Sequence, residues 1–178
     1  MEPSASTLNN LTVLYLLKKS ALPLTGGQIE QAVLQSTDMN FFDLQEAISQ
    51  LVEIKYIEAF QEDTSKDKRY SITDEGSDSL SYFANFLTSD IRNSISEYIF
   101  ENSAGIRQDY DTAATYFNSL NSNDITVKCS LYEENTMLME LSLTVATSSQ
   151  AKLICDNWKN NVTKMYGAVL NTLISGDK

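Results

Sequence analysis

The segment Lys68-Arg69-Tyr70-Ser71-Ile72-Thr73-Asp74-Glu75-Gly76 decides the predicted fold of the first half of the chain. Residues 69–73 are typical of a short extended strand. Thr73 can cap a helix that follows at once, and the carboxylates of Asp74 and Glu75 suit the positive end of that helix. The segment therefore predicts a strand that leads directly into a helix.

A β-hairpin is predicted ahead of this helix. Residues 56–60 form another short extended stretch, and the polar residues 61–68 separate the two strands as a hairpin tip. The tip region carries three cations: Lys66, Lys68 and Arg69. Three carboxylates lie among them, so a solvated tip is the alternative to a cationic binding surface.

Three helices are predicted upstream of the hairpin. The first covers residues 8–19, with Thr7 as its N-cap, and the second begins at the capping box Thr25-Gly26-Gly27-Gln28 and ends near residue 36. The third covers residues 40–55. The apolar residues that recur at helical spacing in it, and that we expect to face the core, are Phe41, Leu44, Ile48 and Leu51, with Val52 beside them.

Downstream of Thr73, the sequence predicts a long helix, after which the spacing of apolar residues changes from that of a helix to that of a strand. One apolar stripe continues from Leu80 to Ile99, and Gly105 is the expected stop. Apolar residues then alternate over residues 125–131 and 137–145, as in a hairpin with one buried face, and residues 112–117 allow a third strand. Ser148 or Ser149 is expected to cap a final helix that covers the sheet. The predicted fold class is α+β.

The quoted segment resembles the end of the wing in PadR- and MarR-like bacterial transcription regulators, where a Tyr-x-hydrophobic-Thr-x-x-Gly turn opens the next helix. Tyr15-Leu16-Leu17 before Pro23-Leu24-Thr25 resembles the first turn of that group, and residues 50–58 resemble its junction after the third helix. The resemblance covers residues 8–80. The second half looks closer to an uncharacterised bacterial family that joins a winged helix to a small α/β domain.

The resemblance of the first half and the apolar patterns of the second half together predict three segments. Residues 1–76 would form a winged helix-turn-helix domain, and residues 77–105 a long connecting helix. Residues 106–178 would form a small domain for dimerisation or sensing, an antiparallel β-meander covered by the C-terminal helix.

The resemblance also implies DNA binding, with the third helix in the major groove and the wing against the backbone. The side chains that would face the groove are Asn40, Phe42, Asp43, Glu46 and Ser49. Those that would contact phosphate are Thr25 and Gln28 at the second helix, and Lys66, Lys68 and Arg69 on the wing. Lys18 and Lys19 are the other nearby pair of cations.

The charge of the chain opposes a generic nucleic-acid binder. Thirteen Lys and Arg stand against 24 Asp and Glu among 178 residues, a net charge of −11. Residues 1–75 hold six cations and twelve acids, so the predicted DNA-binding half carries −6 and the remainder −5. Phosphate neutralisation needs clustered cations, so weak, salt-sensitive and dimer-dependent binding is expected.

Catalytic and cofactor sites are not expected. The chain has no histidine, which excludes Ser-His-Asp and Cys-His sites and His-containing zinc sites, and it has no phosphate-binding glycine motif. Glu133 and Glu134 favour a solvated turn over an acid/base pair.

Cys129 and Cys155 fit buried thiols of a reducing cytosol. No stretch reaches the roughly 20 apolar residues of a membrane span, so we expect a cytoplasmic protein with no cofactor or metal.

Two further expectations concern partners. Trp158 and Tyr166 lie on one side of the last helix and would either line an apolar effector pocket or pack in the core. The apolar surface of the long helices favours a homodimer. The alternatives to a DNA-binding regulator are a winged helix that binds a protein partner and, with only isolated carboxylates to offer, an enzyme.

Overall fold

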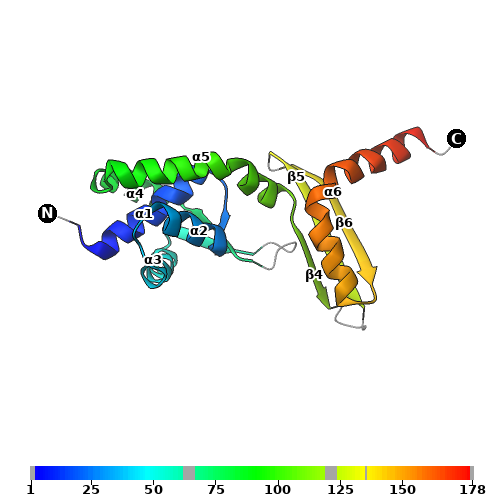
Figure 1. The fold of residues 1–178 in the computed structure, drawn as a ribbon, viewed down its shortest axis with the longest axis horizontal. Coiled ribbons are helices and arrows are strands. Elements are labelled where there is room, and N and C mark those ends of the chain that lie inside the picture. The colour runs from blue at the N-terminus through cyan, green and yellow to red at the C-terminus, as the bar shows by residue number, and fades with distance from the viewer. Residues whose placement is uncertain (1–2, 62–66, 119–123, 135, 177–178) are drawn as a thin grey trace. The chain divides into compact units, whose positions relative to one another are not determined.

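The computed structural model describes residues 3–61, 67–118, 124–134 and 136–176 (Figure 1). Its contacts divide these residues into two compact units, one ending at Ile106 and the other beginning at Arg107. The first unit contains α1 (Ala5–Ser20), β1 (Leu24–Thr25), α2 (Gly26–Ser36), α3 (Phe41–Glu53), β2 (Ile57–Phe60), β3 (Arg69–Ile72), α4 (Asp74–Phe83), the short 3₁₀ helix η1 (Ala84–Phe86) and most of α5 (Ser89–Asp111). The second contains β4 (Ala114–Asn118), β5 (Ile125–Glu133), β6 (Thr136–Val145) and α6 (Ser148–Ser175).

The α+β fold class is confirmed, and the first unit is a winged helix-turn-helix. Helices α1, α2 and α3 pack around one core, and the three short strands form an antiparallel sheet in the order β1-β3-β2. Ile57 pairs with Ile72 and Phe60 with Arg69 across the wing hairpin, while Leu24 pairs with Tyr70 on the other side. Of the predicted hairpin tip, residues 62–66 lie outside the described residues.

Helix α1 begins three residues earlier than predicted. Ser4, not Thr7, is its N-cap, because the Ser4 hydroxyl accepts a hydrogen bond from the Thr7 N–H at 3.1 Å. The helix buries Leu11, Thr12, Val13, Leu14, Leu16 and Leu17 against the rest of the unit. It is therefore the central helix of this core.

Thr73 and Gly76 join the end of the wing to the end of α3. The Thr73 hydroxyl accepts from the Gly76 N–H at 3.1 Å, which caps α4 as predicted, and it lies 2.8 Å from the carbonyl oxygen of Lys55. The Thr73 N–H donates to the carbonyl oxygen of Tyr56 at 3.0 Å. A Cβ at position 76 would lie 2.1 Å from that same oxygen, so the close approach requires glycine.

The predicted uninterrupted helix after Thr73 is wrong. It breaks after Phe83 into η1, and Leu87 is extended and almost completely buried before α5 begins. Thr88 starts the new helix, because its hydroxyl accepts from the Ile91 N–H at 3.4 Å. Gly105 does not end α5 either, since the helix continues to Asp111.

The second unit is an antiparallel meander, β4-β5-β6, that packs against α6. Ile125, Val127 and Cys129 of β5 point into its core, as the alternation predicted, and the possible third strand is present as β4. The N-cap of α6 is Thr147 rather than Ser148 or Ser149, since its hydroxyl accepts from the Gln150 N–H.

No helix within the described ranges is both long enough and apolar enough to cross a membrane.

Candidate nucleic-acid interface

The capping box predicted at the start of α2 is present. The Thr25 hydroxyl accepts from the Gln28 N–H at 3.2 Å, and the Gln28 side-chain oxygen accepts from the Thr25 N–H at 2.9 Å. Both side chains therefore hold the helix start. The backbone amides of Gly26 and Gly27 lie in the first turn beside them, where helix N–H groups suit an anion.

Helix α3 separates a buried face from an exposed one. Leu44, Ala47, Ile48 and Leu51 are buried in the core. Phe42, Glu46 and Ser49 recur at spacings of four and three on the opposite face, and all three are exposed. The side chain of Phe42 is 81% exposed and meets the ring of Phe41 edge to face, with centroids 5.8 Å apart.

Two predicted core positions of α3 are wrong. Phe41 is 43% exposed, because the first turn of α3 extends beyond the core that Leu44 fills. Val52 is exposed as well, one position past the last buried residue of the helix, Leu51. Both side chains add apolar surface to the outside of the first unit.

Asn40 and Asp43 are hydrogen-bonded to each other. The Asn40 side-chain oxygen accepts from the Asp43 N–H at 3.0 Å, and its amide nitrogen donates to the Asp43 carboxylate at 2.8 Å. The pair caps α3, so both side chains have a structural role at the helix start.

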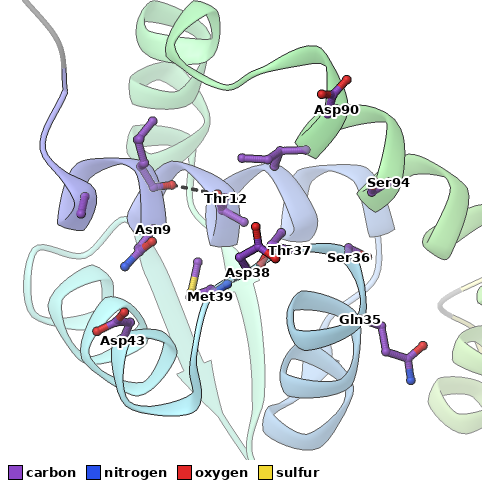
Figure 2. A pocket seen from close by; sticks show the side chains of 13 residues that line it. Asn9, Thr12, Gln35, Ser36, Thr37, Asp38, Met39, Asp43, Asp90 and Ser94 are labelled. Atoms are coloured by element: carbon purple, nitrogen blue, oxygen red, sulfur yellow. Dashed lines mark hydrogen bonds between the residues drawn. The ribbon is translucent and has the colours of Figure 1, made fainter.

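Asp43 also lines a cavity of about 530 Å³ at the turn between α2 and α3 (Figure 2). Asn9 and Thr12 come from α1, Asp38 and Met39 from the turn, and Asp90 from the start of α5. Three carboxylates at this cavity repel phosphate, so the face of α3 near Asp43 is unsuited to a DNA backbone.

The wing differs from the predicted cationic surface. Lys68 is exposed, and Lys66 lies outside the described residues. Arg69 is only 3% exposed, and its Nη1 donates to the carbonyl oxygen of Pro23 at 3.3 Å. Its guanidinium belongs to the packing between β3 and the segment before β1, so Arg69 is not the exposed wing cation that the sequence predicted.

Three other cations of the first unit are exposed. Lys18 donates to the Ser77 hydroxyl at 2.6 Å, and Lys19 lies beside it at the end of α1. Lys55, which no sequence pattern singled out as a binding residue, is exposed at the junction of α3 and β2. Its φ of 61° places it in a left-handed turn, a feature for which the sequence around Lys55 offers no glycine signal.

Trp158 and Tyr166 line different cavities of the second unit. Trp158 borders an apolar cavity of about 390 Å³ with Leu141, Leu143, Leu153, Ile154, Met165, Asn157 and Asn161. Tyr166 borders another, of about 420 Å³, on the side of Tyr132 and Lys159. The indole of Trp158 is 3% exposed and its Nε1 donates to the Ser130 carbonyl at 3.0 Å, so it packs in the core.

The described residues contain no cluster of three or more Cys, Asp and Glu side chains placed to hold a metal ion. Glu133 and Glu134 lie exposed at the β5–β6 turn.

Comparison with known proteins adds the family. No curated protein and no solved structure matches the chain. The model of a family described as a domain of unknown function, DUF4364, matches residues 9–173, which include both units. The chain belongs to the DUF4364 family.

Proposed function

We propose that this chain is a sequence-specific DNA-binding transcriptional regulator that acts in the cytoplasm as a homodimer, without enzymatic activity. One observation carries the proposal. Helix α3 buries one face in the winged-helix core and leaves Phe42, Glu46 and Ser49 exposed on the other. In helix-turn-helix proteins the exposed face of this helix reads the major groove.

These three side chains can read bases without a cation. An exposed aromatic ring such as Phe42 contacts the methyl group of thymine, and the Glu46 carboxylate can accept a hydrogen bond from cytosine N4. The Ser49 hydroxyl suits either a donor or an acceptor. The expected operator therefore contains thymine and cytosine at the positions that face α3.

Backbone contacts would come from the elements beside α3. Lys68 on the wing and Lys55 at the end of α3 supply exposed charge, and the amides of Gly26 and Gly27 supply donors at a helix start. One chain offers few cations, so a dimer that doubles them and reads two half-sites is part of the proposal.

Selection from random DNA tests the proposal, with the purified protein at low salt. We expect enrichment of a two-fold symmetric site, and Phe42→Ala is expected to relax the preference at its own position. Lys68→Glu should weaken binding to all sequences by a similar factor, because a phosphate contact carries no sequence information. Arg107→Glu makes the same change of charge at an exposed residue of α5 in the second unit, outside the wing and α3, and is the matched control. Failure of selection to enrich any sequence would contradict the proposal.

A second candidate function is a winged helix that binds a protein partner. It is favoured by the charge of α3, which contains Asp43, Glu46 and Glu53 and no lysine or arginine. Phe42 and Phe41 would then form the apolar centre of an acidic binding surface. The second candidate predicts that no DNA sequence is enriched and that Phe42→Ala abolishes binding of a basic partner.

A further inference from the structure

Helix α6 is longer than the sheet on which it packs. It has 28 residues, of which Ala151, Trp158 and Val162 are buried, and no residue from 163 to 175 is buried. Figure 1 shows the last turns of α6, in red, projecting past the β4-β5-β6 sheet. The second half of the helix is therefore outside the core of its own unit.

The apolar stripe nevertheless continues into this second half. Met165, Val169 and Leu173 follow Trp158 and Val162 at spacings of three and four residues, the repeat of a helix that packs against another helix. Leu173 is 76% exposed and Ile174 is 80% exposed. A helical end of 13 residues that contains a glycine, Gly167, has only marginal stability in water. Packing against a partner would stabilise it.

The stripe is continuous with apolar surface on the sheet. Leu143 of β6, with Leu153 and Met165 of α6, borders the cavity above Trp158, and all three are exposed. In the described part of the chain β6 is an edge strand of ten residues that pairs with β5 alone. Long uncovered edges are normally protected by another element. We call this surface, formed by Leu143, Leu153, Met165, Val169 and Leu173, the β6–α6 face.

Charge indicates which partner the face accepts. Residues 136–175 carry three lysines and two acids, a net charge of +1, whereas residues 1–135 carry nine cations and 21 acids, a net charge of −12. Two copies of such an acidic chain repel each other wherever the acidic surfaces approach. The segment that forms the β6–α6 face carries almost no net charge, so two copies can approach there with little repulsion, and the same apolar side chains would meet from both copies.

We propose that the β6–α6 face is the surface through which two copies of this chain associate, with the second halves of the two α6 helices packed against each other. The inference deepens the proposed function by naming the surface of its homodimer. It does not depend on DNA binding, because the exposed apolar side chains that form the face all lie in the second unit and the charge comparison involves no nucleic acid.

Mass in solution tests the interface, measured by sedimentation over a range of concentrations. The wild-type chain should have twice its 19.9 kDa mass. Leu173→Asp and Val169→Asp place a charge in the contact and should raise the dissociation constant by about 100-fold or more. Both side chains are exposed in the single chain, so the far-ultraviolet circular dichroism of each variant should show that the unit still folds.

Phe100→Asp is the matched control. Phe100 is 83% exposed on α5 of the first unit, so this change removes a comparable apolar surface outside the β6–α6 face and should leave the dimer intact. A dimer that survives both α6 changes, or that only Phe100→Asp dissociates, would overturn the inference. A wild-type monomer whose Trp158 emission shifts on addition of an apolar dye would also overturn it and identify the cavity as a small-molecule site. A dimer that binds no DNA would uphold the inference and remove the proposed function alone.

Discussion

At Gly76 the backbone leaves no space for a side chain. The Tyr56 carbonyl oxygen that receives the Thr73 N–H lies 2.1 Å from where a Cβ would be, and the contact is with backbone, which cannot move aside cheaply. The Thr-x-x-Gly pattern thus has two physical causes in this chain. Threonine caps α4, and glycine allows the start of α4 to approach the end of α3.

We predict that Gly76→Ala lowers the free energy of unfolding by about 2–3 kcal/mol, because the methyl group forces the backbone apart. Gly105→Ala is the control, since an added Cβ there meets nothing within 4 Å and lies in the middle of α5. It should raise the free energy of unfolding by about 1 kcal/mol. Urea denaturation measures both, and equal effects of the two changes would contradict the explanation of Gly76.

Cys129 is the residue whose titration the fold changes most clearly. Burial raises the pKa of its thiol from 9.0 to about 12, and the nearby Cys155 adds to the rise. Its side chain is fully buried in β5, so the thiol is both protonated and inaccessible at neutral pH.

The raised pKa of Cys129 makes the stability of the second unit depend on pH. The unfolded thiol loses its proton above pH 9 while the folded one keeps it, so the folded state binds more protons and loses stability as the pH rises. Relative to Cys129→Ala, the wild type should lose up to about 1.4 kcal/mol per pH unit between pH 9 and 12. Denaturation at several pH values measures this difference. Parallel curves for the two proteins, or rapid alkylation of Cys129 in the folded Cys155→Ser variant at pH 8, would disprove the assignment.

At the scale of elements, the N-caps of α2 and α4 were predictable because their signals are local, whereas the predicted N-caps of α1 and α6 were three residues too late and one or two residues too late. Thr25 and Gln28 form their box within four residues, and Thr73 caps α4 three residues before Gly76. The break between α4 and α5 depends on the burial of Leu87 among core residues far from it in the sequence. The apolar stripe that passes through Leu87 therefore predicted a continuous helix wrongly. Thr88 followed by Ser89 and Asp90 was a usable signal for a new helix start.

Site residues were less predictable than elements. Arg69 is buried because its side chain reaches the Pro23 carbonyl, a contact between residues 46 positions apart that no local pattern encodes. Phe42, Glu46 and Ser49 were expected to face the groove because the family resemblance implies it, and their exposure agrees with the helical repeat, which places them opposite the buried face of α3. The separation of Trp158 and Tyr166 into two cavities follows from how α6 lies on the sheet, which periodicity alone does not fix.

Trp158 links α6 to β5 through the bond from its Nε1 to the Ser130 carbonyl oxygen. We predict that Trp158→Phe, which keeps an aromatic ring but removes the donor, lowers the free energy of unfolding by about 1–3 kcal/mol, because it deletes a buried hydrogen bond and leaves part of the indole volume unfilled. Tyr82→Phe removes a hydroxyl from an exposed ring on α4 and should change it by less than about 0.5 kcal/mol. Circular dichroism during urea denaturation compares the two, and an unchanged stability of Trp158→Phe would show that the bond contributes nothing.

At the scale of the whole molecule, acidity and DNA binding have to be reconciled. The net charge of −11 is distributed over both halves, and of the three predicted wing cations the structure describes Lys68 as exposed and Arg69 as buried. A dimer joined through a surface that carries little charge would double the exposed lysines that each winged helix brings to DNA. We therefore predict binding that is weak, dimer-dependent and steeply reduced by salt.

The salt dependence of binding to a selected operator tests this central claim most directly. If each chain neutralises ~2–3 phosphates, the dimer neutralises roughly 4–6, and log K plotted against log salt should fall with a slope of about −4 to −5. Lys68→Glu should make the slope shallower by about 2 for the dimer, since each chain loses one contact. A slope near zero, or no binding to any DNA at low salt, would contradict the account.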